Sequence, residues 1–181
     1  MITELLMAMW LESVYPTPPP IDLTNLPKKV QQHKPLRYNP YNLTVSSNLT
    51  EKHIRRMLKG TRLASLATSY LEAEKTYNVN AYFLIGLTIQ ESGWGNSHFA
   101  RTRNNITGYC AYTNKPNDAM YFPSRHDCIM MTARHLRKSY LTKGGSYYEG
   151  TSIWNVNANY SISGWAESIN TIINHIKRLD K

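Results

Sequence analysis

Residues 80–97 read NAYFLIGLTIQESGWGNS, and this stretch decides the fold. Its first part, residues 81–91, is apolar on nearly every side of a helix, which is typical of a buried helix at the centre of a core. Asn80 is a suitable N-cap for this helix, and Gly93 together with Gly95 predicts its end. We therefore expect a helical domain built around one central buried helix.

One carboxylate, Glu91, stands at the carboxyl end of this apolar run. The helix dipole at that end and the apolar neighbours Ile89 and Trp94 both disfavour the charged form, so a raised pKa is expected. A carboxyl group with a raised pKa can protonate a glycosidic oxygen near neutral pH. The same pattern also fits an ordinary solvated glutamate at a helix end, and both interpretations stand at this point.

The sequence on either side predicts further helices and one irregular region. Helical spacing and capping signals favour helices over residues 51–60, 62–78, 124–140 and 164–179. Residues 101–123 lack a helical period, are rich in Asn, Thr and Tyr, and contain the turn sequence TNKPND. The predicted fold class is mainly α within an α+β architecture: a helical bundle around the central helix with a small irregular β-lobe.

Seven of the nine prolines lie between residues 16 and 40. Such a segment favours extended or polyproline geometry and buries little core by itself. Residues 1–15 predict a short amphipathic helix, which is too short to span a bilayer and lacks the basic region and cleavage site of a classical signal peptide. We therefore expect an N-terminal arm, residues 1–49, that docks on the domain or on another subunit, and a globular domain, residues 50–181.

The charge of the chain suits an anionic partner. Lys and Arg number 21 and Asp and Glu 12, which gives a formal net charge of +9. Nucleic acid, a membrane surface or a cell wall that bears teichoic acid would each attract this charge, and simple solubility is the alternative. The basic residues are dispersed without a Lys/Arg block, so we expect no nucleic-acid partner. The 13 Tyr and 4 Trp favour contacts with polar, stackable rings.

Neither cysteines nor histidines show the spacing of a metal site. Cys110 and Cys128 match no ligand pattern, and Cys128 lies in an apolar helical pattern that favours a buried free thiol, with a disulfide left open. His98, His126 and His135 have no partner at metal-ligand spacing. We expect no metal and no cofactor.

Taken in order, several segments between residues 52 and 178 resemble glycoside hydrolase family 73. Residues 78–100, NVNAYFLIGLTIQESGWGNSHFA, are similar to the family signature, which has Val-Asn, an aromatic residue and Leu, then Glu-Ser/Thr-Gly-x-Gly-x-Ser. The segments NITGY, AY, LRKSYL and IWNVNANYSISGW follow in the family's order. The resemblance implies an endo-β-N-acetylglucosaminidase with a lysozyme-like fold, as found in cell-wall hydrolases of bacteria and their phages.

The resemblance also implies roles for individual residues. Glu91 matches the catalytic acid and Tyr160 the tyrosine beside the cleft. The resemblance implies substrate binding by Asn105, Tyr112, Trp154 and Asn155. Trp94 is a further expected substrate-binding residue, because its ring is suited to stack on a sugar face. For each aromatic residue taken singly, packing in the core is the alternative. The chain departs from the family pattern at Thr107, Thr113, Ser163 and Trp165.

These departures leave the second catalytic group open. A second carboxylate would lie roughly 6.5–9.5 Å from the acid in an inverting enzyme and roughly 5–5.5 Å in a retaining one. Asp118 is the better candidate, because Asp127 is better explained as a helix cap and Glu167 as a first-turn charge; Glu149 is a weaker choice. We favour a third route, in which the 2-acetamido group of the substrate attacks the anomeric carbon and Tyr160 either orients that group or stabilises the positive charge.

The expected function is therefore that of a peptidoglycan hydrolase acting on the β-1,4 bond between N-acetylglucosamine and N-acetylmuramic acid in glycan strands. The alternatives are a muramidase or lytic transglycosylase of the same fold, or a non-catalytic wall-binding or structural tail subunit. The substrate lies outside the membrane, and residues 1–15 do not have the features of a classical signal peptide. A phage virion protein would reach the substrate without one, so we expect a location at the tail tip, docked on other subunits through residues 1–49. An extracellular or cell-wall location is the alternative.

Overall fold

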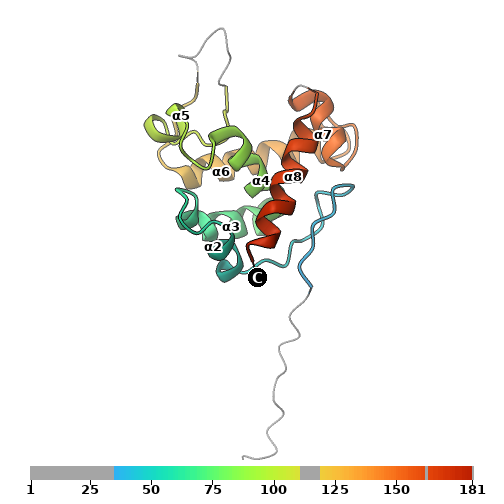
Figure 1. Ribbon diagram of the computed structural model, residues 1–181. Helices are drawn as coiled ribbons and strands as arrows, with labels where there is room; N and C mark the ends of the chain where they lie inside the picture. The colour runs from blue at the N-terminus through green and yellow to red at the C-terminus, as the bar shows by residue number, and fades with distance from the viewer. Residues whose placement is uncertain (1–34, 111–118, 162, 181) are drawn as a thin grey trace, which may run out of the picture. The chain divides into compact units, whose positions relative to one another are not determined.

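The computed structural model describes residues 35–110, 119–161 and 163–180, and this part of the chain is helical (Figure 1). It contains no strand, and its α-helices are α2 (Glu51–Met57), α3 (Ala67–Tyr77), α4 (Ala81–Ser92), α5 (His98–Thr102), α6 (Arg125–His135), α7 (Ile153–Tyr160) and α8 (Trp165–Arg178). A short 3-10 helix, Ala64–Leu66, precedes α3, and a π-helix, Leu136–Tyr140, continues α6. Within the described residues, every helix is too short or too polar to span a bilayer.

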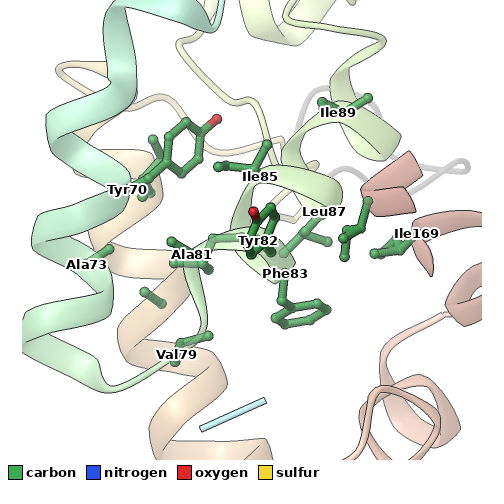
Figure 2. Packing of buried hydrophobic residues seen from close by; sticks show 14 of the residues in the cluster. Tyr70, Ala73, Val79, Ala81, Tyr82, Phe83, Ile85, Leu87, Ile89 and Ile169 are labelled. Carbon is green, nitrogen blue, oxygen red and sulfur yellow. The ribbon is translucent and has the colours of Figure 1, made fainter. Parts of the chain in front are cut away.

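The predicted central helix is confirmed as α4. Ten of its twelve residues are buried. Figure 2 shows apolar side chains of α4, among them Ile85 and Leu87, near Tyr70 of α3 and Ile169 of α8. The Asn80 side chain accepts a hydrogen bond from the Phe83 N–H, and Gly93 ends the helix in the left-handed conformation with φ 54°. Both boundaries therefore follow from the capping residues that the sequence contains.

Helix α8 packs closely on α4 because residue 86 has no side chain. A Cβ atom at Gly86 would lie 2.8 Å from Cγ1 of Ile173 and 3.0 Å from Cγ2 of Ile169, too close for either contact. The two isoleucines and Trp165 belong to the buried face of α8. This close packing brings the first residue of α8 to the carboxyl end of α4.

Residues 35–49, which the sequence assigned to the N-terminal arm, are packed into the domain. Leu43 has no exposed surface, its N–H donates to the Thr151 carbonyl at 2.9 Å, and its carbonyl accepts from the Asn80 N–H at 2.8 Å. The Ile153 N–H donates to the Pro40 carbonyl at 2.8 Å. This segment thus connects the starts of α4 and α7. The rest of the predicted arm, residues 1–34, lies outside the described residues.

The predicted β-lobe, residues 101–123, contains no strand in its described residues, and 111–118 lie outside them. Its two described ends are joined by backbone hydrogen bonds from Met120 to Tyr109, at 3.1 Å, and from Phe122 to Arg103, at 2.9 Å. The described part of this region is therefore irregular chain that is held together by hydrogen bonds.

Candidate active site

A pocket of about 560 Å³ lies at the carboxyl ends of α4 and α7. It joins segments that are far apart in the sequence. The described residues that line it are Glu91, Thr107, Gly108, Tyr109, Cys110, His135, Tyr140, Tyr147, Asn159, Tyr160 and Ser161. Glu91 is the only carboxylate among these described lining residues. The pocket brings Glu91 and Tyr160 together.

Glu91 occupies the last turn of α4, and the residues after it explain why the helix ends there. The N–H of the left-handed residue Gly93 donates to the Ile89 carbonyl. The hydroxyl of the buried Ser92 accepts a hydrogen bond from the Gly95 N–H at 2.8 Å. The Glu-Ser-Gly-x-Gly sequence thus terminates the helix immediately after the carboxylate and presents its side chain to the pocket.

The carboxyl group of Glu91 is mostly withdrawn from water. Burial raises its pKa, because desolvation penalises the charged form, and a hydrogen bond from Trp165 opposes part of this rise. That bond joins Nε1 of Trp165 to Oε1 of Glu91 at 2.8 Å. The raised pKa predicted from the sequence is confirmed in direction, and a protonated Glu91 is available as a proton donor at higher pH than an exposed glutamate.

Tyr160 ends α7 and lies in the pocket wall. Its ring centroid is 5.0 Å from that of Trp165 and 5.5 Å from that of Tyr140. Burial first and the nearby carboxyl of Glu91 second raise the pKa of the Tyr160 hydroxyl far above its usual range. The phenol therefore remains protonated at any physiological pH and is able to donate a hydrogen bond to a substrate.

The π-helix that continues α6 supplies an aromatic wall that the sequence did not reveal. His135 precedes it and Tyr140 ends it, with ring centroids 5.6 Å apart. Tyr147 stacks on Tyr140 at 5.0 Å, and Tyr109 meets His135 edge-on at 5.7 Å. Burial lowers the pKa of His135, so its imidazole is neutral near pH 7. The segment LRKSYL contains Tyr140, but helical periodicity gives no signal for a π-turn.

Thr107, which stands where the family pattern has phenylalanine, is accommodated by polar contacts. Its hydroxyl lies 2.9 Å from that of Thr132 and 3.4 Å from Sγ of Cys128. Cys128 is buried and both cysteines of the chain are free, so the predicted buried thiol is confirmed. Next to Thr107, Gly108 has φ +66°, and a Cβ atom there would lie 3.4 Å from Oε2 of Glu91.

Two of the expected substrate-binding residues, Asn105 and Asn155, bind the protein's own backbone. Asn105 is 1% exposed, and its amide bonds to both the N–H and the carbonyl of Tyr109. Asn155 forms a capping box with Ser152 at the start of α7. Neither asparagine lines the pocket, and both hold pocket segments in place.

Trp94 and Trp154 also lie outside the set of pocket-lining residues. Trp94 has φ 62° and meets the ring of His175 edge-on at 6.4 Å. Trp154 is 38% exposed, contacts the ring of Tyr41 at 5.2 Å, and donates its indole N–H to Glu167 at 2.9 Å. Direct contact of these tryptophans with a substrate stays a prediction.

The structure also places the other carboxylates that the sequence offered. Asp127 is bonded to Ser124 at the start of α6, as expected for a cap, and Glu149 lies in an exposed loop. Asp118 and Tyr112 lie outside the described residues. Within the described segments, no group of three or more His, Cys, Asp or Glu side chains is arranged to hold a metal ion.

Comparisons with known proteins identify the family of this chain. The family model described as "Glucosaminidase: Mannosyl-glycoprotein endo-beta-N-acetylglucosaminidase" matches residues 67–178. Putative endo-beta-N-acetylglucosaminidases of Streptococcus pneumoniae, from strains TIGR4 and R6, are each 25% identical over 145 residues, or 75% of this chain. The chain spans only 22% and 20% of the length of these two relatives.

Solved structures of S. aureus autolysin E share the fold. The structure of its complex with the muropeptide NAM-L-ALA-D-iGLU has a TM-score of 0.60 at 20% identity, covering 80% of this chain and 74% of the other. A catalytic mutant of autolysin E in complex with the disaccharide NAG-NAM gives a TM-score of 0.55 at 17% identity over the same shares. The glucosaminidase family model covers more than half of the residues of the present chain. The chain therefore belongs to the glucosaminidase family, glycoside hydrolase family 73.

Proposed function

We propose that this domain hydrolyses the β-1,4 bond between N-acetylglucosamine and N-acetylmuramic acid in peptidoglycan. The observation that carries the proposal is Glu91, a carboxyl group with a raised pKa in the wall of a pocket of about 560 Å³. Family membership supports the reaction class. The autolysin E complexes with a muropeptide and with NAG-NAM support glycan as the ligand.

In the first step Glu91 acts as the general acid. Its proton moves to the glycosidic oxygen while the bond between that oxygen and the anomeric carbon breaks, and the electron pair of the bond stays on the oxygen. Glu91 is left as a carboxylate. Its raised pKa makes this transfer possible near neutral pH, where an exposed glutamate is almost fully ionised.

For the second group we propose the substrate's own 2-acetamido group, because Glu91 is the only carboxylate among the described lining residues. The acetamido oxygen bonds to the anomeric carbon as the leaving oxygen departs. A water molecule then bonds to that carbon while the bond to the acetamido oxygen breaks and its electron pair returns to the acetamido group, and a proton of the water passes to the carboxylate of Glu91. The protonated hydroxyl of Tyr160 is suited to orient the acetamido group. Asp118 is the carboxylate alternative.

The aromatic wall supports sugar binding. The rings of Tyr109, His135, Tyr140 and Tyr147 line the pocket, and aromatic faces pack well against the apolar faces of pyranose rings while their polar atoms bond to hydroxyls. The neutral state of His135 avoids placing a second buried charge near the reacting bond.

Digestion of purified peptidoglycan by the wild type and by Glu91→Gln tests the proposal. We expect wild-type products with reducing-end N-acetylglucosamine, identified by borohydride labelling and mass spectrometry, and a rate at least 10²-fold lower for the variant. Reducing-end muramic acid would identify a muramidase instead, and its 1,6-anhydro form a lytic transglycosylase. Wall binding without any cleavage by the wild type would identify a non-catalytic binding subunit.

The setting in which the domain works is a separate proposal. We expect, from the sequence, a tail-tip location in a phage virion with residues 1–49 contacting other subunits, or otherwise a cell-wall location. The two Streptococcus pneumoniae relatives are bacterial proteins. Mass spectrometry of purified phage particles and of washed cell walls distinguishes the two locations.

A further inference from the structure

Trp165 and Glu91 are 74 residues apart in the sequence and form a direct hydrogen bond, with 2.8 Å between Nε1 and Oε1. The indole has little freedom, since Trp165 is 5% exposed and begins α8. Phe83 packs edge-on against it at 6.2 Å, and Tyr160 lies against its face at 5.0 Å. The direction of the indole N–H is therefore fixed by the surrounding rings.

An indole nitrogen only donates hydrogen bonds, so the carboxyl oxygen that it contacts must accept. The better acceptor of a neutral carboxyl group is its carbonyl oxygen. When Glu91 is protonated, Oε1 is therefore the carbonyl oxygen and Oε2 carries the proton. The two oxygens of Glu91 are made inequivalent by one neighbour.

The second oxygen faces a position without a side chain. A Cβ atom at Gly108 would lie 3.4 Å from Oε2 of Glu91, and Gly108 itself lines the pocket. The backbone there has φ +66°, a conformation that glycine adopts readily and other residues rarely do. Oε2 thus lies next to the pocket backbone, while Oε1 is engaged by the indole.

We propose that Trp165 is a positioning residue that assigns the acid proton to Oε2 of Glu91 and stabilises the carboxylate after that proton has left. This inference rests on the proposed function of Glu91 as the general acid. During the reaction the proton passes from Oε2 to the leaving oxygen, and the negative charge that forms is shared with Oε1. A hydrogen bond to a charged acceptor is stronger than one to a neutral acceptor, so the indole favours the state after transfer.

Other titratable side chains lie in the pocket and contribute to the pH dependence of the activity. The titratable side chains that line it with Glu91 are Tyr109, Cys110, His135, Tyr140, Tyr147 and Tyr160. Burial raises the pKa values of Tyr140 and Tyr160 and lowers that of His135. The hydrogen bond from Trp165 lowers the pKa of Glu91, so its removal must raise that pKa.

The test is Trp165→Phe, which removes the N–H and keeps an aromatic ring between Phe83 and Tyr160. We expect the alkaline limb of kcat against pH to move upward by on the order of one pH unit, because a bond to a charged group is lost. We also expect kcat at its optimum to fall about tenfold with KM within twofold, since the acid loses its fixed direction. Ile176→Val is the packing control, since Ile176 is buried on the same helix three turns beyond Trp165: it should lower Tm and leave the alkaline limb in place.

A second readout needs no activity. In ¹H–¹⁵N spectra the indole signal of Trp165, assigned by its absence in Trp165→Phe, should shift with pH as Glu91 ionises, and this shift should vanish in Glu91→Gln. Two results would overturn the inference. One is an indole chemical shift whose pH dependence is the same in Glu91→Gln as in the wild type, and the other is a profile of kcat against pH for Trp165→Phe that is identical to that of the wild type. Full activity of Glu91→Gln would instead overturn the proposed function, whatever the indole signal does.

Discussion

The side-chain amide of Asn105 holds both polar groups of the Tyr109 backbone. Its Oδ1 accepts from the Tyr109 N–H at 2.9 Å, and its Nδ2 donates to the Tyr109 carbonyl at 2.9 Å. Nδ2 also donates, at 3.1 Å, to the carbonyl of Met120, which follows residues 111–118 in the sequence. The loop that contains Gly108 and lines the pocket beside Glu91 is therefore shaped by one buried amide.

Asn105→Ala should disturb both stability and activity. The change removes three partly buried hydrogen bonds, and we expect a loss of about 2–4 kcal/mol of unfolding free energy. Urea denaturation followed by circular dichroism measures this. Asn105→Asp is the matched control: it keeps the acceptor for the Tyr109 N–H and loses the two donors. If the alanine variant unfolds like wild type, the amide does not shape this loop.

Gly108→Ala should lower the rate of hydrolysis, whereas Gly144→Ala, with a similar loss of stability, should not. A methyl group at this position would lie 3.4 Å from Oε2 of Glu91 and narrow the approach to it. Gly144→Ala is the control, because Gly144 also has positive φ, +87°, and has no atom within 4 Å of the added Cβ. Each change costs about 1 kcal/mol of backbone strain. We expect a rate loss of about tenfold or more for Gly108→Ala alone; equal rates for both variants would contradict this.

The local features of the fold were predictable, because they depend on neighbours in the sequence. Asn80 and Gly93 mark the ends of α4 within a few residues of the atoms that they cap. The contacts that complete the site are of another kind. The bond from Trp165 to Glu91 and the packing of Leu43 at the start of α4 join residues that are brought together only by the fold. The hydrophobic periodicity within one segment does not predict a contact with a distant segment.

The boundary of the domain shows the same difference. A proline-rich composition indicates extended chain, and residues 35–49 contain no α-helix, but composition does not say what an extended chain packs on. Leu43 and Ser47 have no exposed surface. The burial of these two residues comes from partners in α3, α4 and the loop before α7, and these partners were not evident from the sequence.

Glu74 should be important for stability because one carboxylate connects three segments. Oε1 accepts from the N–H groups of Ser47 and Ala81, at 2.8 Å and 2.9 Å, and Oε2 accepts from the Ser47 hydroxyl at 2.9 Å. We expect Glu74→Ala to cost about 2–4 kcal/mol in urea denaturation, since bonds to charged acceptors are the stronger ones. Glu72→Ala, at an exposed position of the same helix, should change stability by no more than about 0.5 kcal/mol. Equal effects would show that the carboxylate of Glu74 contributes nothing special.

Glu91→Gln should make the protein more stable near neutral pH. Burial raises the pKa of Glu91 in the folded state above its value in the unfolded chain, so the folded state binds the proton more tightly. Glu91 therefore lowers stability as the pH rises from the unfolded pKa through the folded one, and below the unfolded pKa it has no such effect. The glutamine amide cannot ionise, and its oxygen still accepts a hydrogen bond from Trp165. The Tm difference between the variant and the wild type should be positive at pH 7–8 and vanish by about pH 4, with roughly 2–4 °C for each kcal/mol. Thermal unfolding across this pH range measures it, and a difference that is independent of pH would show that the Glu91 carboxyl has an unshifted pKa.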